Sequence, residues 1–157
     1  MNSTDVTFLS RAIQLARENV TNGGGPFGAI IVKDGETVAE SANQVISIPD
    51  PTAHAEIQTI RMAAQNLNTF DLSGTTLYTS CEPCPMCLGA VYWSRISRVV
   101  YASDRHDAGK AGFRDAELYQ EIALDPDQRG TRFENIKLPE GGQEFTDWKN
   151  SDIKLDY

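Results

Sequence analysis

Four side chains that can do chemistry lie in two short stretches of the sequence. PTAHAEIQTIR contains His54 and Glu56, and SCEPCPMCLGAVYW contains Cys84 and Cys87. The whole chain has only 2 histidines and 3 cysteines, so most of its soft metal ligands lie in these stretches. One imidazole and two thiolates suit a tetrahedral zinc ion. We therefore predict a zinc site formed by His54, Cys84 and Cys87.

Three protein ligands leave the fourth position of a tetrahedral zinc ion open to water. Structural zinc sites usually have four protein ligands, whereas catalytic sites keep this open position. The pKa of water in that position falls to roughly 7, so water can become a nucleophile at neutral pH. Glu56 lies two residues after His54 and is not needed as a ligand. It is therefore predicted to be the catalytic group that moves protons.

Each of the two motifs is a weak signal when it stands alone. A histidine beside a glutamate is common on helix surfaces, and C-x-x-C also fits redox sites and structural zinc sites. H-x-E followed by P-C-x-x-C is, however, the signature of zinc nucleobase deaminases. A zinc-binding module without catalysis is the alternative from a different class.

Cys81 lies outside the ligand spacing and is expected to be a small buried residue, and His106 is expected in a surface loop.

Helices and strands must bring these side chains together. Apolar residues at helical spacing predict a helix over residues 5–20. Two apolar segments around Asp34-Gly35 predict an antiparallel hairpin, with strands at about 28–33 and 37–43.

The two chemical stretches are each predicted to begin a helix. Pro49 and Pro51 end the preceding structure before TAHAEIQTIRMAAQNL, and Pro83 and Pro85 open the helix in EPCPMCLGAVYWSR. Further strands are expected in TTLYTS, SRVVYAS and TRFENIKL, and further helices in DAELYQEIAL and GGQEFTDWKN.

This order of elements predicts an α/β fold, a three-layer α/β/α sandwich around a central mixed five-stranded sheet. Strands that are joined through helices run parallel, and sites in such sheets lie outside the carboxyl ends of the strands. Both chemical helices begin there, so the histidine and the cysteines can meet.

Length and composition limit the remaining choices. A chain of 157 residues, 40% hydrophobic, is expected to form one domain over residues 1–157. Its 14 basic and 22 acidic residues give a net charge of -8, which argues against a nucleic-acid partner. No apolar run approaches the roughly 20 residues that cross a bilayer. The first residues lack the features of a secretion signal. The clustered cysteines suit a reducing compartment. We therefore expect a cytoplasmic protein without a membrane partner.

Several other residues could hold a planar substrate. Phe27 and Trp93 could stack on a ring, although aromatic residues are more often part of the core. Asn43 could bond the edge of a base, or it could simply end a strand. Asp115 could contact the substrate, or it could cap the following helix. The residues alone leave these alternatives open.

With these residues in view, the chain resembles the small bacterial-type guanine deaminases of the cytidine/deoxycytidylate deaminase superfamily. The similarity covers almost the whole chain, through GGPFGAIIVKDG, DPTAHAE, LYTSCEPCPMCLGAVYW, AGFRD and the terminal Tyr157. The tRNA adenosine deaminases share DPTAHAE and a very similar cysteine helix. The choice of substrate therefore rests on the YW after the cysteine helix, on AGFRD, on the terminal tyrosine and on the acidic net charge.

The resemblance implies a cytidine deaminase-like fold with one zinc ion per subunit, and hydrolysis of guanine to xanthine and ammonia in purine salvage or catabolism. The rival substrates are guanosine, an aminated triazine such as ammeline, cytosine and, less favoured, adenosine in tRNA. By position, Glu56 and Asp115 would be catalytic. The substrate would be contacted by Phe27, Asn43, Ala55, Trp93, Asp115 and Tyr157.

The resemblance also implies a homodimer that acts on a small purine base. In this dimer the C-terminal segment, residues from about 140 to 157, would close the active site or cross to the partner subunit. A flexible acidic tail is the alternative for this segment.

Overall fold

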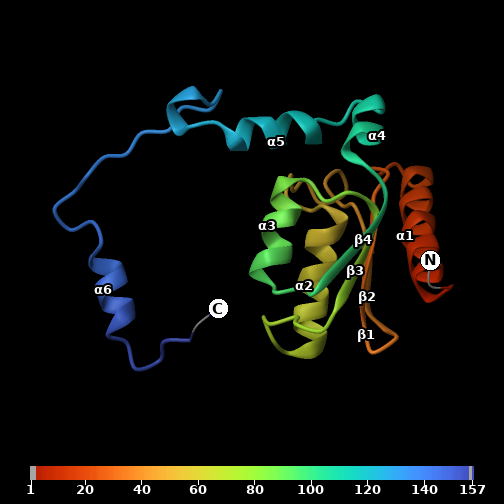
Figure 1. The fold of residues 1–157 in the computed structure, drawn as a ribbon, viewed down its shortest axis with the longest axis horizontal. Helices are drawn as coiled ribbons and strands as arrows, with labels where there is room; N and C mark the ends of the chain where they lie inside the picture. The colour runs from red at the N-terminus through yellow and green to blue at the C-terminus, as the bar shows by residue number, and fades with distance from the viewer. Residues whose placement is uncertain (1–2, 156) are drawn as a thin grey trace.

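The computed structural model describes residues 3–155 and 157. Most helices and strands appear where the sequence predicts them, but one predicted strand, at residues 131–138, is missing and one helix, α4, was not predicted (Figure 1). In chain order the elements are α1 (Ser3–Thr21), β1 (Gly28–Lys33), β2 (Glu36–Ala42), α2 (Ala55–Leu67), β3 (Thr76–Cys81), α3 (Pro85–Trp93), β4 (Arg98–Ser103), α4 (Arg105–Lys110), α5 (Asp115–Ala123), a 3-10 turn (Pro126–Gln128) and α6 (Gln143–Lys149).

Within the described residues, four strands form one mixed sheet in the order β2-β1-β3-β4. β1 is antiparallel to both β2 and β3, whereas β3 and β4 are parallel. α1 covers one face of the sheet, and α2 and α3 cover the other (Figure 1). The predicted three-layer α/β/α arrangement around a mixed sheet is therefore confirmed.

The expected fifth strand is absent from this structure. Residues 131–138, which the structure describes in full, are irregular and exposed, and the chain carries them away from the sheet (Figure 1). A strand needs a partner for its backbone hydrogen bonds, and this segment does not lie beside β4. The prediction of five strands was wrong for the single chain, and β4 remains an edge of the sheet.

The core lies on both faces of β1, because successive side chains of a strand point to opposite faces. Ile30 and Val32 pack with residues of α1, and Ala29 and Ile31 pack in the cluster that faces α2. Gly28 has no side chain for a steric reason: a Cβ there would lie 2.3 Å from the carbonyl oxygen of Ala12 in α1. The sheet and its helices thus form a well-packed scaffold that supports the loops at the carboxyl ends of the strands.

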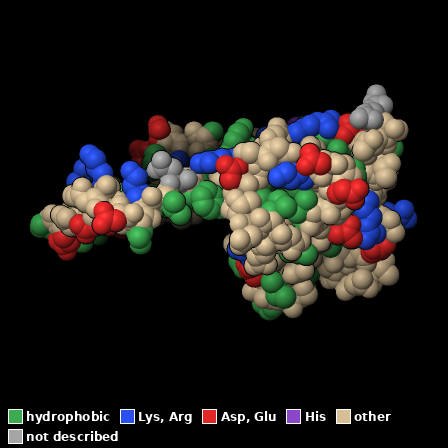
Figure 2. All heavy atoms as spheres, turned by 90° about the horizontal axis from the view of Figure 1, so that it is seen from below, with side chains coloured by type: hydrophobic (Ala, Val, Ile, Leu, Met, Phe, Trp, Pro, Cys, Tyr) green, Lys and Arg blue, Asp and Glu red, His purple; other side chains and the backbone are tan. Residues whose placement is uncertain are grey.

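Most of the chain beyond α5 lies apart from the sheet and its helices, but Tyr157 returns to α3, where its ring contacts that of Trp93. α6 is separated from the sheet, and hydrophobic side chains are visible on this extended part of the surface (Figures 1 and 2). Exposed large apolar residues recur along it: Phe133, Ile136, Leu138, Phe145, Trp148, Ile153, Leu155 and Tyr157. Within residues 3–155 and 157, no helix combines the length and the apolar character that a membrane span requires.

Candidate active site

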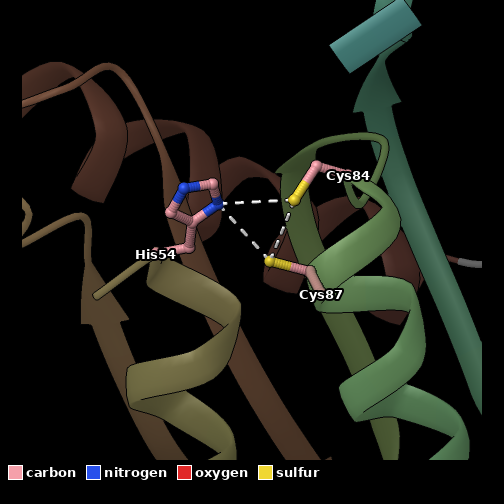
Figure 3. A group of neighbouring side chains, drawn as sticks. All are labelled: His54, Cys84 and Cys87. Carbon is pink, nitrogen blue, oxygen red and sulfur yellow. Dashed lines mark hydrogen bonds between the residues drawn. The ribbon is translucent and has the colours of Figure 1, made fainter. Parts of the chain in front are cut away.

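His54, Cys84 and Cys87 converge from the starts of two helices. His54 is the N-cap residue of α2, Cys84 is the N-cap residue of α3, and Cys87 lies in the first turn of α3. Neither N-cap side chain caps its own helix. Instead the imidazole and the two sulfur atoms point toward one another (Figure 3).

The three donor atoms have the spacing of a tetrahedral zinc site. His54 Nδ1 lies 3.5 Å from each sulfur, and the two sulfurs lie 3.6 Å apart. Zinc bond lengths of roughly 2.3 Å to sulfur and 2.1 Å to nitrogen would separate tetrahedral ligands by roughly 3.6 to 3.8 Å. The donor set and its spacing therefore fit zinc.

The cysteine pair favours a negative charge at Cys84. Hydrogen bonding with the Cys87 thiol and then with His54 lowers the pKa of Cys84 to about 4, despite its burial. The same contact, together with burial, raises the pKa of Cys87. The neighbouring thiolate raises the pKa of His54. A thiolate beside an imidazole is an arrangement that a dication stabilises.

Glu56 lines the same cavity as His54 and Cys84 and is only 4% exposed. Thr79 donates a hydrogen bond from Oγ1 to Glu56 Oε1 over 3.4 Å. Burial is the main cause that raises the pKa of Glu56, with the charge of Cys84 acting in the same direction. A carboxyl group with a raised pKa can both accept and return a proton near neutral pH.

A cavity of about 200 Å³ opens in front of these residues. It brings together most of the residues predicted to form the site: Phe27, Asn43, His54, Glu56, Cys84 and Asp115. The structure adds lining residues that sequence reasoning missed: Gly25, Val45, Ile46, Glu82 and Phe113. Glu82 and Phe113 lie within the quoted stretches SCEPCPMCLGAVYW and AGFRD, whereas Val45 and Ile46 carry no sequence signal.

Asn43 is nearly buried, and its amide has a fixed orientation. The backbone N–H of Val45 donates to Asn43 Oδ1 over 3.2 Å, so the amino group is the part of the amide that is left for a ligand. Asn19 donates to the backbone carbonyls of Gly25 at 2.7 Å and Asn43 at 2.8 Å. Two adjacent backbone segments of the cavity wall are therefore joined through Asn19.

Two aromatic rings and a carboxylate also line the cavity. Phe27 and Phe113 meet edge to face, with ring centroids 4.8 Å apart. Asp115 is the first residue of α5, and burial is the main cause that raises its pKa, followed by the charge of Cys84. Arg114 pairs with Glu117 at 2.6 Å on the exposed side of the helix, so it is engaged elsewhere.

Three predicted substrate contacts lie outside the cavity. Trp93 is 70% exposed at the end of α3, and Tyr157 is 69% exposed with its ring 6.1 Å from that of Trp93. Ala55 is fully buried in the core cluster between the sheet and α2. Their contacts with substrate therefore stay predictions.

The remaining cysteine and the remaining histidine are not part of the donor cluster. Cys81 is buried, as expected, with Sγ 3.6 Å from the carbonyl oxygen of Asp104. His106 is exposed, but it lies in α4 and not in the predicted loop.

Comparison with known proteins agrees with this geometry. The family model for the cytidine and deoxycytidylate deaminase zinc-binding region matches residues 2–103. The guanine deaminase of Bacillus subtilis (strain 168) is 49% identical over 152 residues, which cover 96% of this chain and 97% of the relative. A tRNA-specific adenosine deaminase of Aquifex aeolicus is 44% identical over 96 residues, which cover 61% of this chain and 64% of the relative.

Solved structures show the same pattern. The X-ray structure of the Bacillus subtilis guanine deaminase has a TM-score of 0.95 and covers 100% of this chain and 99% of its own. The protein NE0047 in complex with 2,6-diaminopurine has a TM-score of 0.69 at 31% identity, covering 76% of this chain and 71% of its own. NE0047 mutants were also solved in complex with 8-azaguanine. The chain therefore belongs to the cytidine and deoxycytidylate deaminase family, within the group of bacterial-type guanine deaminases.

Proposed function

We propose that this chain is a zinc-dependent aminohydrolase that converts guanine to xanthine and ammonia in purine salvage or catabolism. The observation that carries the proposal is one cavity that is lined by two of the three donor residues, His54 and Cys84, together with the buried Glu56 and the side-chain amide of Asn43. The near full-length similarity to a guanine deaminase, and the purine analogues bound to NE0047, support guanine over the other substrates.

His54, Cys84 and Cys87 would hold one zinc ion per subunit. When bound, zinc polarises water so that it can attack a ring carbon at neutral pH. The side chains of the cavity carry out the proton transfers and orient the base.

Glu56 moves the protons of the reaction. Its carboxylate takes a proton from the attacking water and delivers it to N3 of guanine, because addition at C2 places negative charge on that nitrogen. A second proton from the same water then reaches the exocyclic amino group, which leaves as ammonia. The raised pKa of Glu56 suits it to carry both protons in turn.

Asn43, Asp115 and the aromatic pair orient the base. The Asn43 amino group can donate to O6 or N7 of guanine, which are both acceptors. The Asp115 carboxylate can accept a hydrogen bond from the exocyclic amino group and so orient that group to receive the second proton as it leaves. Phe27 and Phe113 offer an apolar wall for the flat ring.

The working form is proposed to be a cytoplasmic homodimer, with residues 1–157 as one deaminase domain. Residues from about 140 to 157 would reach the partner subunit and place Tyr157 over its cavity. The exposed apolar side chains of this segment and the open edge of β4 support the proposal, because both are surfaces that a second copy could cover.

Ammonia release with a panel of substrates tests the function. The zinc-loaded protein should turn over guanine faster than guanosine, ammeline, cytosine or adenosine in tRNA. Faster turnover of guanosine would overturn the choice of substrate, and a protein that binds zinc but releases no ammonia from any of them would be a binding module.

A Glu56→Gln substitution tests the mechanism. It should lower kcat by about 10²- to 10⁴-fold, because the amide cannot take up the proton of water. Zinc content should stay unchanged, since Glu56 is not a ligand. Glu36→Gln, in the exposed hairpin, is the control for loss of a carboxylate and should keep full activity. Normal turnover by Glu56→Gln would remove the assigned role.

A further inference from the structure

α5 places Asp115 at the cavity, although the helix itself packs only weakly against the rest of the protein. None of its nine residues, all of which the structure describes, is buried. A short helix that lacks a buried stripe receives little stability from packing. Its orientation, and with it the position of Asp115, must depend on a few specific contacts.

Tyr119 makes one of these contacts. It lies four residues after Asp115, so both side chains are on the same face of α5. Its hydroxyl donates to the carbonyl oxygen of Pro83 over 2.7 Å. Pro83 directly precedes the zinc ligand Cys84, so this bond joins the helix of Asp115 to the segment that presents a ligand.

Arg105 makes a second contact with Tyr119, by lying over its ring. Its guanidinium carbon lies 3.6 Å from the centre of the Tyr119 ring, which is within cation–π range. Glu82 fixes Arg105 by a two-pronged pair, Nε to Oε2 at 3.0 Å and Nη2 to Oε1 at 2.6 Å. The backbone N–H of Arg105 also donates to Glu82 Oε2 over 3.1 Å.

These contacts converge on two adjacent residues of the loop before Cys84. Glu82 holds Arg105, Pro83 accepts from Tyr119, and Arg105 lies against the ring of Tyr119. Glu82 also lines the cavity. The set of Glu82, Pro83, Arg105 and Tyr119 is called the α5 clamp below.

We propose that Tyr119 and Arg105 are positioning residues, which hold the Asp115 carboxylate at a fixed place relative to the zinc ligands. The inference rests on the catalytic role proposed for Asp115. A reacting group that moves by about 1 Å can lose about 100-fold in rate. The α5 clamp thus acts on kcat through Asp115 and leaves zinc binding unchanged.

Tyr119→Phe and Arg105→Gln test the α5 clamp against matched controls. Tyr78→Phe removes another tyrosine hydrogen bond of 2.7 Å, to Asp5, and Arg11→Gln removes another two-pronged pair with a 2.6 Å contact, to Glu40. None of the control residues lines the cavity. Tyr119→Phe and Arg105→Gln should lower kcat by about 10- to 100-fold with normal zinc content, while the controls keep their kcat. Equal kcat values in all four variants would overturn the proposal.

A double-substitution cycle shows whether the clamp acts through Asp115. Tyr119→Phe should have little further effect on kcat in an Asp115→Asn background, because the group that it positions is already lost. Independent, multiplicative effects would contradict the inference. Full activity of Asp115→Asn would refute both the catalytic role of Asp115 and the clamp that depends on it, while guanine deamination itself would stand.

Hydrogen exchange gives a readout that needs no substrate. Peptides from residues 115–123 should exchange faster in Tyr119→Phe than in the wild-type protein, and Tyr78→Phe should leave their exchange unchanged. Unchanged exchange in Tyr119→Phe would show that the bond to Pro83 does not hold α5. A protein that is inert toward guanine but shows this exchange difference would lack the proposed function and keep the clamp.

Discussion

Asn43 can bind a ligand with its side chain because a hydrogen bond from Asn19 holds its backbone in place. Asn19, near the end of α1, uses its amide group to donate to the carbonyls of Asn43 and Gly25, which lie on two segments of the cavity wall. A Cβ at Gly25 would lie 3.2 Å from the Asn43 amide carbon, so glycine allows these segments to approach. The Asn19 amide, which is half-buried, therefore sets the spacing between the loop after α1 and the end of β2.

Asn19→Ala should loosen this wall. The Asn43 carbonyl would lose the donor that Asn19 supplies, and the Gly25 carbonyl would keep only the backbone N–H of Phe27. Each hydrogen bond that is lost costs about 1 kcal/mol of stability. We expect KM for guanine to rise by about 10-fold, with a smaller change in kcat, because the reacting groups on α2 and α3 are untouched. Steady-state kinetics and urea unfolding measure the two effects. Asn22→Ala, at an exposed position beyond α1, is the control, and an unchanged KM for Asn19→Ala would refute the role.

Single residues differed in how well the sequence could reveal them. His54, Cys84 and Cys87 were predictable because metal ligands must have particular atoms at particular spacings, and the structure brings those atoms within 3.6 Å of one another. Asn19 and Tyr119 act through contacts with residues 24 and 36 positions away in the chain. Such pairings follow from the fold, and a local pattern does not contain them.

Among the elements, α1 is tied to the sheet by a charged contact as well as by packing. Asp5, in the first turn of α1, accepts a hydrogen bond from the Tyr78 hydroxyl at 2.7 Å. It also accepts two from Arg98 of β4, both at 2.8 Å. These bonds lower the pKa of Asp5 to about 2, and the largest contribution comes from Arg98. One carboxylate thus joins a helix to two strands.

This contact predicts a pH dependence of stability. The pKa of Asp5 in the folded state lies below its unfolded value, so its contribution is fully present above about pH 4 and is lost as the pH falls toward 2. Asp5→Asn should reduce the free energy of unfolding at pH 7, and the difference from wild type should shrink below about pH 4. Urea unfolding at several pH values measures this difference. Asp34→Asn, in the exposed turn between β1 and β2, controls for the lost charge, and a difference that does not change with pH would contradict the argument.

Elements with strong periodicity were predictable, and those without it were not. The run GAIIVK and the helix at residues 5–20 appear where expected, since burial on a fixed face leaves a regular pattern. α4 was missed because it has only six residues and one buried residue, Ala108. Its start depends on Asp104, which accepts from the backbone N–H groups of His106 and Asp107.

For the whole molecule, the sequence predicted one more strand than the single chain forms. Residues 131–138 have strand-like composition, but a strand also requires a neighbour, and the neighbour is not specified by the segment itself. In this structure β4 presents an open edge, and the segment lies away from it with Ile136 79% exposed. A homodimer would resolve both features, because one chain could supply what the other leaves uncovered.

Two inactive variants test whether the C-terminal segment acts across the dimer. A chain that lacks Tyr157 should fold and bind zinc but turn over slowly, because its cavity is no longer closed. Glu56→Gln keeps the segment but cannot move the proton. If the segment closes the partner's cavity, a Glu56→Gln subunit can complete the site of a truncated one. Co-expression of the two chains should then restore about a quarter of the wild-type activity, since about half of the dimers are mixed and each has one working site.

Light scattering and kinetics on the co-expressed protein check this outcome. We expect the mass of two chains of 17.3 kDa each. Full activity of the truncated chain alone would show that Tyr157 has no role in the active site. A mixed sample that stays as inactive as its two components would mean that each segment closes the cavity of its own subunit, because no subunit in that sample would combine an intact Glu56 with an intact C-terminus. Recovered activity requires both groups in one site, and only the partner subunit can then supply the second.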